Sequence, residues 1–553
     1  MPFGVGTIQL LIVAALAAAT GYIWQLEGRG RWRPLLTDRF LYGVPWGTLI
    51  TVAGVVAFYL FAQSGLRHWA EPVTVAFRSW SYSYLPGMLS SGFAHGSPDH
   101  LVGNLIGTVV LAPIAEYAFS HYPPQRSGGT AEKFQYPPPS RTSLGVGSAQ
   151  TGESGLLRRP WFRAFVVFPA VVFAVSLVTS VLALGWSLGF SGTVFAFGGF
   201  VVVLLPLTAI VSMLVISVVG VSYRALTEPV LRVTADPGAP GPPSWAGVNV
   251  QAHLLGFLLG VLLGIALLRA RRRRPAAGRV FLAVLVFGIA RQLWALPLSN
   301  DDTFIQYRGI GLLLVLAVTV LVTATVAAED SKLLGRFRKR GVLVAGLLLV
   351  VVALAVPSVF GNLGGLAEDP VPEGAVAVDD YRVTYAEDAD HGRIDTTDSG
   401  VIVVSERRDV WFTPVSEAKL GHEGNATIPV GGVGWHETVE AERTGWEVVG
   451  NDSVYAVDLT TDGETTRSFT SSPSRAAVQL TNHSITLAPA SGAFRVSVRH
   501  NGTTVGTAPI PERNGSVSVG PIRFVTAPEN GGSVSLLATR DGTRVEVASR
   551  ETY

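Results

Sequence analysis

The run FSGTVFAFGGFVVVLLPLTAIVSMLVISVVGVSY, residues 190–223, decides how this chain folds, because its 34 residues carry no charge. As one helix, at about 1.5 Å per residue, it would be about 50 Å long, whereas the hydrocarbon core of a bilayer is about 30 Å thick. Pro206 lies near the middle of the run and offers a break in the helix. The run is therefore either one over-long helix or two short helices that reverse direction at Pro206.

Further apolar stretches on both sides of this run are close to the length of about 20 residues that crosses a bilayer. They lie at about 4–25, 43–64, 100–119, 161–184, 248–268, 280–298, 309–328 and 341–360. The first stretch lacks the basic region and the small-residue cleavage site of a signal peptide. We therefore expect it to remain in the protein as a membrane span.

Clusters of basic residues indicate which loops face the cytoplasm. Three clusters lie within residues 29–39, 269–274 and 332–340, and short loops rich in Arg and Lys stay on the cytoplasmic side. The first two clusters fall on one side only if residues 190–223 cross the membrane twice. The sequence therefore predicts ten spans in a multi-pass protein of the cell membrane, with both termini and the C-terminal domain outside the cytoplasm.

The composition agrees with a membrane protein that carries a separate exterior domain. Of the 553 residues, 48% are hydrophobic and 15% are charged, against about 25% charged in average soluble domains, which excludes an ordinary soluble enzyme. Residues 361–553 hold 27 acidic and 15 basic side chains, whereas residues 1–360 hold 13 acidic and 27 basic ones. The absence of cysteine excludes disulfides, thiol nucleophiles and Cys-ligated zinc.

Residues 361–553 predict an all-β exterior domain built as one or two antiparallel β-sandwiches. Short runs rich in Val, Thr, Tyr and Ile alternate there with turn signals such as Asn501-Gly502 and Asp541-Gly542. Five Asn-x-Ser/Thr sequons fall in this part, as an exported domain allows. These candidate N-glycosylation sites are Asn425, Asn451, Asn482, Asn501 and Asn514.

Two loops of the membrane part are long. Residues 120–160 are rich in Pro, Gly and Ser and predict a flexible cytoplasmic linker. Residues 65–99 form an outer loop whose aromatic side chains we expect at the membrane interface. These aromatic residues are Trp69, Trp80, Tyr82 and Tyr84.

Polar residues near the outer ends of the spans predict a nucleophilic site. Ser191 begins the first arm of the hairpin, and His253 lies near the outer end of its own span. The four-residue spacing of His100 and Asn104 puts both side chains on one helix face, again near the outer end. An imidazole can take the hydroxyl proton of a serine and return it to a leaving amine. Side chains such as His100 and Asn104 could then donate to the oxyanion that develops on a scissile carbonyl.

Glycines beside these residues would let two helices approach closely. Gly189 and Gly192 flank the serine, while Gly256 and Gly260 follow His253 on one helix face. Small residues at this spacing are also a common packing device in membrane helices. A nucleophilic site is favoured because the serine, the two histidines and Asn104 agree in their spacing along the helices, in the side of the membrane and in their depth within it.

Metal binding is the rival interpretation of the polar residues, since His95, Asp99, His100 and His253 could converge. However, His95 and His100 would be splayed by about 140° on a helix, and no His-Glu-x-x-His motif occurs. We therefore expect no metal. Arg291 lies inside its predicted span, where we expect it to snorkel or to pair within the bundle.

The strings around these residues resemble the rhomboid family of intramembrane serine proteases. The matching strings are His95-x4-His100-x3-Asn104 with Glu116 twelve residues later, Gly189-Phe190-Ser191-Gly192, and Ala252-His253-x2-Gly256-x3-Gly260. The resemblance covers residues 43–268 and implies a six-helix catalytic core there. Residues 1–42 would add an N-terminal helix and a cytoplasmic loop, and residues 269–360 three further spans.

Only four lysines occur, which together with the acidic exterior domain hints at a salt-adapted prokaryote such as a haloarchaeon.

The resemblance also implies a role for each residue. Ser191 would be the nucleophile and His253 the base, with no third carboxylate, and His100 and Asn104 would line the oxyanion hole. Structural roles near the site would fall to His95, Glu116, Gly189, Gly192, Phe195, Gly256 and Gly260. The family hydrolyses a peptide bond in or beside a substrate's transmembrane helix and needs no cofactor.

The chain departs from the family pattern in three features. Many members carry a Trp-Arg pair in the outer loop where this chain has Gly87-Met88, which puts the anchoring of that loop in doubt. Phe195 replaces a frequent Tyr, and Ala112 replaces a Gly. The expected activity is that of a serine endopeptidase acting on transmembrane proteins; the alternative is a non-catalytic rhomboid-like scaffold that binds or escorts transmembrane helices. Membrane lipid is a further expected partner, and nucleic acid is not.

Overall fold

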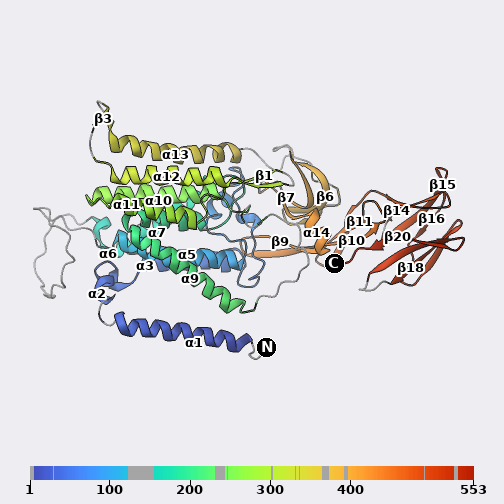
Figure 1. Cartoon of the computed structure of the whole chain (residues 1–553), viewed down its shortest axis with the longest axis horizontal. Helices are drawn as coiled ribbons and strands as arrows, with labels where there is room; N and C mark the ends of the chain where they lie inside the picture. Colours follow the sequence, from blue (N-terminus) through green and yellow to red (C-terminus); the bar gives the residue numbers. More distant parts are fainter. Residues whose placement is uncertain are drawn as a thin grey trace, which may run out of the picture.

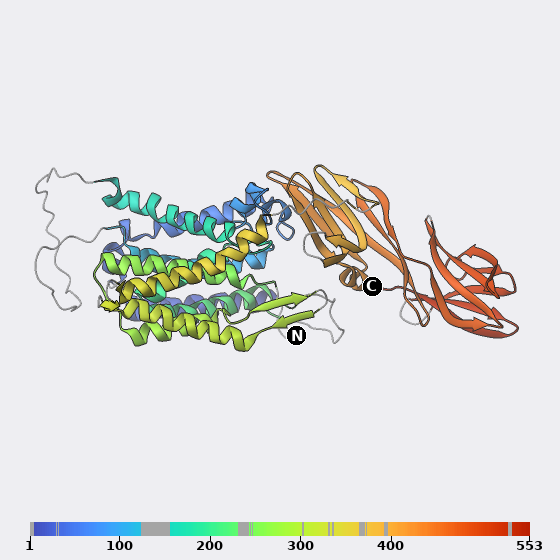
Figure 2. The same cartoon turned by 90° about the horizontal axis from the view of Figure 1, so that it is seen from above.

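A helical part and a β part lie end to end in the computed structural model of the chain (Figures 1 and 2). The structure describes residues 5–28, 32–122, 155–230, 247–300, 303–329, 332–334, 337–363, 373–391, 396–490, 492–528 and 533–553, together with positions 30, 243, 245 and 371. Most of the predicted linker at 120–160 lies outside the described residues.

Apolar helices make up the first part. Seven of the described helices are long and apolar enough to cross a membrane: Gly6–Leu26, Pro98–Phe119 (α5), Pro160–Val181, Pro206–Thr227 (α9), Val250–Ala270 (α10), Arg308–Ala327 (α12) and Lys339–Asn362 (α13). Three shorter apolar helices complete the set: Trp46–Ala62, Ser191–Leu204 (α8) and Ala277–Ala290 (α11). The chain is therefore a membrane protein, and the described residues contain as many apolar helices as the spans predicted.

Several of these spans are composite. The first joins α1 (Val5–Ile23) to the π-turn Trp24–Gly28, the second joins α3 (Trp46–Ala57) to Phe58–Ala62, and the fourth joins α6 (Pro160–Phe162), Arg163–Val167 and α7 (Phe168–Val181). Short helices α2 (Trp32–Thr37) and α4 (Leu85–Ser90) and the hairpins β1 (Pro297–Asn300)–β2 (Thr303–Gln306) and β3 (Lys332–Leu334)–β4 (Phe337–Arg338) lie between spans.

The uncharged run 190–223 is broken where Pro206 predicts it. Helix α8 ends at Leu204, and Leu205 leaves the helical conformation with φ −137° and ψ 62° before α9 begins at Pro206. With 14 residues, α8 is only about 21 Å long at 1.5 Å per residue, which is shorter than the hydrocarbon core. A helix this short cannot span the hydrocarbon core by itself, and Ser191 is its first residue.

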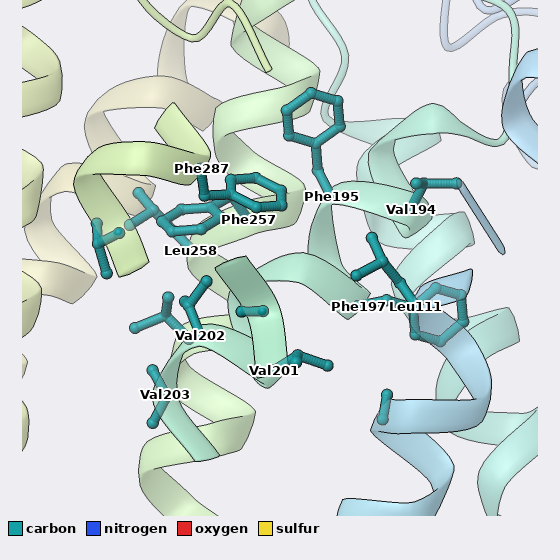
Figure 3. Close-up of a cluster of buried hydrophobic side chains, with 14 of the residues drawn as sticks. Leu111, Val194, Phe195, Phe197, Val201, Val202, Val203, Phe257, Leu258 and Phe287 are labelled. Atoms are coloured by element: carbon teal, nitrogen blue, oxygen red, sulfur yellow. The ribbon is translucent and has the colours of Figure 1, made fainter. Parts of the chain in front are cut away.

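Helices α8 and α10 pack with their backbones in contact. An ideal Cβ on Gly256 would lie 2.0 Å from the carbonyl oxygen of Gly192, and one on Gly260 would lie 1.9 Å from that of Ala196. Only glycine fits such a crossing. Beneath it lies the buried apolar cluster drawn in Figure 3, in which Val202, Phe257 and Phe287 belong to α8, α10 and α11.

The β part consists of two antiparallel sandwiches that share one long sheet. Its strands are β5 (Val376–Val378), β6 (Tyr381–His391), β7 (Thr396–Ser405), β8 (Val410–Ser416), β9 (Asn425–Gly432), β10 (Trp435–Val448), β11 (Val454–Thr461), β12 (Glu464–Thr470), β13 (Ser474–Leu480), β14 (His483–Ala490), β15 (Ala493–His500), β16 (Thr503–Pro509), β17 (Ser516–Val519), β18 (Ile522–Pro528), β19 (Val534–Arg540) and β20 (Thr543–Arg550), with helix α14 (Glu417–Glu423) after β8.

Strand β10 links the two sandwiches because it pairs with β9, β11 and β20 within one eight-stranded sheet. Strands β5 to β8 cover the sandwich nearer the helices, and β13 to β16 cover the distal one (Figure 2). The all-β prediction is therefore confirmed. All five sequon asparagines are exposed.

The outer loop 65–99 packs against the near sandwich. Trp80, which is 3% exposed, and Val75 belong to the same buried cluster as Tyr381 and Val401 of the β part. The expectation that the loop aromatics lie at the membrane interface is therefore wrong for Trp80. The reason is that the β part covers the loop and removes this ring from both lipid and water.

Candidate active site

Ser191 and His253 meet at the end of the helical part nearer the β part, where the close α8–α10 crossing brings their backbones together. The Ser191 hydroxyl lies 2.7 Å from Nε2 of His253. When the ring carries its proton on Nδ1, the serine donates to Nε2, which is the geometry a base needs to take that proton. The two residues are 62 positions apart in the chain, so tertiary packing alone creates the pair.

The His253 ring is held by stacking. Phe195, one turn along α8 from Ser191, lies parallel to it with ring centroids 4.2 Å apart and planes 11° apart. Figure 3 shows Phe195 at the edge of the apolar cluster. Among the described residues no carboxylate pairs with His253, so the arrangement is a dyad. The described residues also contain no group of three His, Cys, Asp or Glu side chains that could hold a metal.

Two polar residues preceding His253 fix the start of α10. Asn249 caps the helix by accepting a hydrogen bond from Ala252 N at 2.9 Å. Gln251 donates to the carbonyl oxygens of Leu182 at 2.9 Å and Leu354 at 2.8 Å. These contacts tie the start of α10 to α7 and α13, and sequence reasoning missed both residues, because an amide near a helix end has no distinctive pattern.

His100 and Asn104 of α5 line the same cavity as the dyad. Ser97 caps this helix, accepting from the His100 N–H at 3.2 Å, and the His100 Nδ1 lies 3.4 Å from Gly96 N. The Asn104 Nδ2 is buried and has no hydrogen-bond partner among the described residues. A buried amide donor beside a serine is available to an oxyanion.

Gly189 allows α8 to begin close to these donors. Its φ of +125° is a conformation that residues with a side chain rarely adopt. An ideal Cβ at this position would also lie 2.6 Å from His100 Nε2 and 3.5 Å from Asn104 Nδ2. Gly192 is confined in the same way, because its Cβ would lie 2.9 Å from Thr179.

His95 and Glu116 take no part in the cavity. The His95 ring is fully buried and lies edge-on to His100, with centroids 5.1 Å apart. Glu116, also fully buried, lies at the other end of α5, where its carboxylate accepts from the backbone N–H groups of Gly47 and Thr48 at 2.7 and 2.8 Å and contacts His121 at 2.6 Å. Glu116 thereby accepts hydrogen bonds from N–H groups that have no partner within the first turn of α3, as a carboxylate does at a helix N-terminus.

The cavity above the dyad has a volume of about 690 Å³. Besides the predicted residues it is lined by Arg78, Trp186 and Arg291, which sequence reasoning did not place in the site. An arginine inside an apolar span is a signal for a functional group, and the sequence placed Arg291 inside such a span. That placement is wrong, because α11 ends at Ala290 and Arg291 is its C-cap residue. Arg78 carried no such signal, because its loop has no regular spacing.

Comparisons of the chain with protein-family models, with curated proteins and with solved structures found no match. The function is therefore inferred from the geometry of the site and from the strings that surround it.

Proposed function

We propose that this protein is an intramembrane serine endopeptidase of the rhomboid type. The observation that carries the proposal is the 2.7 Å contact between Ser191 Oγ and His253 Nε2 at the outer end of a bundle of apolar helices. The glycines around the site give a second support. Gly256 and Gly260 let α10 approach the backbone of α8 closely, and a direct Ser191–His253 contact requires such an approach. The six-helix core would be residues 43–268.

The reaction would follow from the positions of four side chains. His253 takes the hydroxyl proton as Ser191 Oγ bonds to the scissile carbonyl carbon. Asn104, His100 and the N–H groups at the start of α8 donate to the oxyanion that forms. The proton then passes from His253 to the leaving amine as the C–N bond breaks, and water cleaves the acyl-enzyme by the same steps in reverse.

Substrates would be transmembrane proteins whose helix unwinds at the outer end of the bundle. A cavity of about 690 Å³ holds a few residues of extended chain, and it does not hold a folded helix with side chains, which is about 10 Å wide. The nucleophile is the first residue of α8, which is too short to span the hydrocarbon core by itself. The cleaved bond would accordingly lie in or beside the membrane.

Covalent labelling tests the proposal most directly. Detergent-solubilised protein should react with a fluorophosphonate, and Ser191→Ala and His253→Ala should each abolish the labelling. Ser217→Ala is the matched control, because this exposed hydroxyl bonds its own helix at Met213 O. Incubation with a model transmembrane substrate should give cleavage that Ser191→Ala removes. Cleavage that persists in Ser191→Ala would refute the assignment, and absent labelling and cleavage in the wild type would favour the non-catalytic scaffold.

A further inference from the structure

The cavity above the dyad carries two guanidinium groups and no carboxylate. Arg78 and Arg291 both line it, and none of its lining residues is Asp or Glu. Neither arginine forms an ion pair with a described residue. Within the described part of the chain, the pocket beside Ser191 therefore has positive charge that no carboxylate compensates.

Arg78 reaches the cavity from the outer loop. Its guanidinium contacts the rings of both Trp186 and Phe412, 4.6 Å from each centroid, and these two rings also contact each other edge to face. The Arg78 Nε is buried and has no hydrogen-bond partner among the described residues. Burial lowers the pKa of Arg78 to about 10, so the group remains charged at neutral pH. On the cavity side it lies close enough to His100 to interact with it electrostatically.

Arg291 enters from the end of α11. A Cβ on Gly107 of α5 would lie 3.6 Å from its Nη2, which places the guanidinium one helical turn from Asn104. It also interacts electrostatically with His253. The two arginines thus line the same cavity as the dyad, where Arg78 interacts electrostatically with His100 and Arg291 with His253.

Charge left unpaired in a partly buried pocket is costly, and a ligand of opposite charge removes that cost. Guanidinium groups present planar sets of N–H donors that match a carboxylate. We propose that Arg78 and Arg291 form a carboxylate-recognition site, which selects substrates carrying an Asp or Glu side chain within a few residues of the cleaved bond. This inference rests on the proposed protease function and names its substrate class.

Phe412 gives this site a second property. It belongs to β8 of the near sandwich, yet its ring is one of the two that contact the Arg78 guanidinium. The position of one recognition group therefore depends on how the β part docks. The contacts that the described residues give Arg291, with Phe287 and near Gly107, lie in the helical part, so that the two arginines can be separated by mutation.

The test compares matched substrates. A model transmembrane substrate is made with a single Glu at each position around the cleaved bond, and with Gln at the same positions. The wild type should cleave the preferred Glu substrate with a kcat/KM about tenfold or more above that of its Gln partner, mainly through KM. Arg291→Gln and Arg78→Gln should bring this ratio toward one, and Arg291→Glu should favour a Lys substrate.

The ratio of kcat/KM for the Glu and Gln substrates is measured within each variant, so a difference in the folded fraction between variants cancels. Fluorophosphonate labelling gives the number of active sites in each preparation. Arg67→Gln is the matched control, because Arg67 is exposed in the same loop. A wild-type ratio of one at every position, with labelling intact, would overturn the inference and leave the protease proposal standing. Equal inhibition of both substrates by vesicles of anionic lipid would assign the arginines to a lipid headgroup and overturn it too. Absent wild-type labelling would overturn both proposals.

Discussion

Phe412 of the β part lies over the guanidinium of Arg78 at 4.6 Å, and its ring is also 5.0 Å from that of Trp186. Phe412, Arg78 and Trp186 come from the β part, from loop 65–99 and from the segment just before Ser191, respectively. A domain that the sequence separates from the membrane part thereby contacts the wall of the active-site cavity. The contact makes loop 65–99 part of a shared core, which supplies the anchoring that the absence of a Trp-Arg pair at Gly87-Met88 puts in doubt.

Removing the Phe412 ring should loosen this contact. Phe412→Ala loses ring contacts with Trp80 and Trp186 and one cation–π contact, so we expect the free energy of unfolding to fall by about 1–3 kcal/mol. Thermal unfolding followed by tryptophan fluorescence measures this change. The rate of fluorophosphonate labelling should fall as well, because Trp186, in the segment just before Ser191, loses a ring contact.

The control for this prediction is Phe494→Ala. Phe494 packs partly buried in the distal sandwich, so its loss should lower stability there and leave the labelling rate unchanged. Equal labelling rates in Phe412→Ala and Phe494→Ala would show that docking of the β part does not reach the active site.

The stacking of Phe195 on His253 predicts a kinetic effect. Phe195→Ala removes a parallel ring at 4.2 Å, and an aromatic pair contributes about 0.5–1.5 kcal/mol. We expect the labelling rate to fall by about 2- to 10-fold, because His253 is held less firmly. Phe195→Tyr keeps the ring and should retain the wild-type rate within about twofold. Full activity in Phe195→Ala would mean that packing from other sides already holds His253.

Spacing along the chain, the basic loops and the matched depth of the spans together predicted that Ser191 and His253 lie close, and the structure places them 2.7 Å apart; their catalytic role stays a prediction. The break at Pro206, the shared face of His100 and Asn104, and the glycines after His253 all follow from helix geometry and from the width of a bilayer. Such features are local or are set by the membrane, which constrains depth even between residues far apart in sequence. The contact between Ser191 and His253 needed only matched depth and a close helix crossing.

The docking of the β part could not be predicted in this way. Alternation of apolar residues shows that a strand has a buried face, and it does not show what covers that face. Trp80 and Tyr84 were expected at the membrane interface because nothing in the sequence shows that the β part covers their loop. Arg291 was expected to snorkel or to pair in the bundle. Its approach to Gly107 could not be predicted, because that approach depends on how α11 lies against α5. These contacts are set by tertiary packing alone.

Close packing of α8 on α10 predicts a severe effect of a single methyl group. The Cβ of Gly256→Ala would meet the carbonyl oxygen of Gly192 at 2.0 Å, and backbone cannot move away as a side chain can. Overpacking of this kind costs about 1–3 kcal/mol or more. We expect a lower unfolding temperature and loss of labelling. Gly103→Ala is the control, because a Cβ there meets nothing within 4 Å; equal behaviour of the two variants would contradict the crossing.

A pair of histidines joins the two parts and should make their docking depend on pH. His436 of β10 stacks on His68 of the outer loop with centroids 3.7 Å apart, and its Nε2 lies 2.9 Å from the carbonyl oxygen of Glu71. Burial, chiefly, lowers the pKa of His436 below its ordinary value of 6.5. The docked state therefore favours the neutral ring, and the undocked state binds more protons. Docking is complete above pH 6.5 and should weaken as the pH falls through the lowered pKa.

Limited proteolysis of the full chain between pH 8 and pH 5 measures this docking, with cleavage of the segment between the two parts expected to increase at low pH. His436→Gln keeps a donor for the Glu71 carbonyl but cannot titrate, so its proteolysis should depend less on pH. His422→Gln is the matched control, because His422 is exposed on α14 of the same sandwich and should keep the wild-type dependence. An unchanged pH dependence in His436→Gln would show that another group controls docking, with the carboxylate of Asp380 beside Arg408 next to be examined. The pKa of Asp380 is lowered, so its contribution would be lost only in more acidic solution.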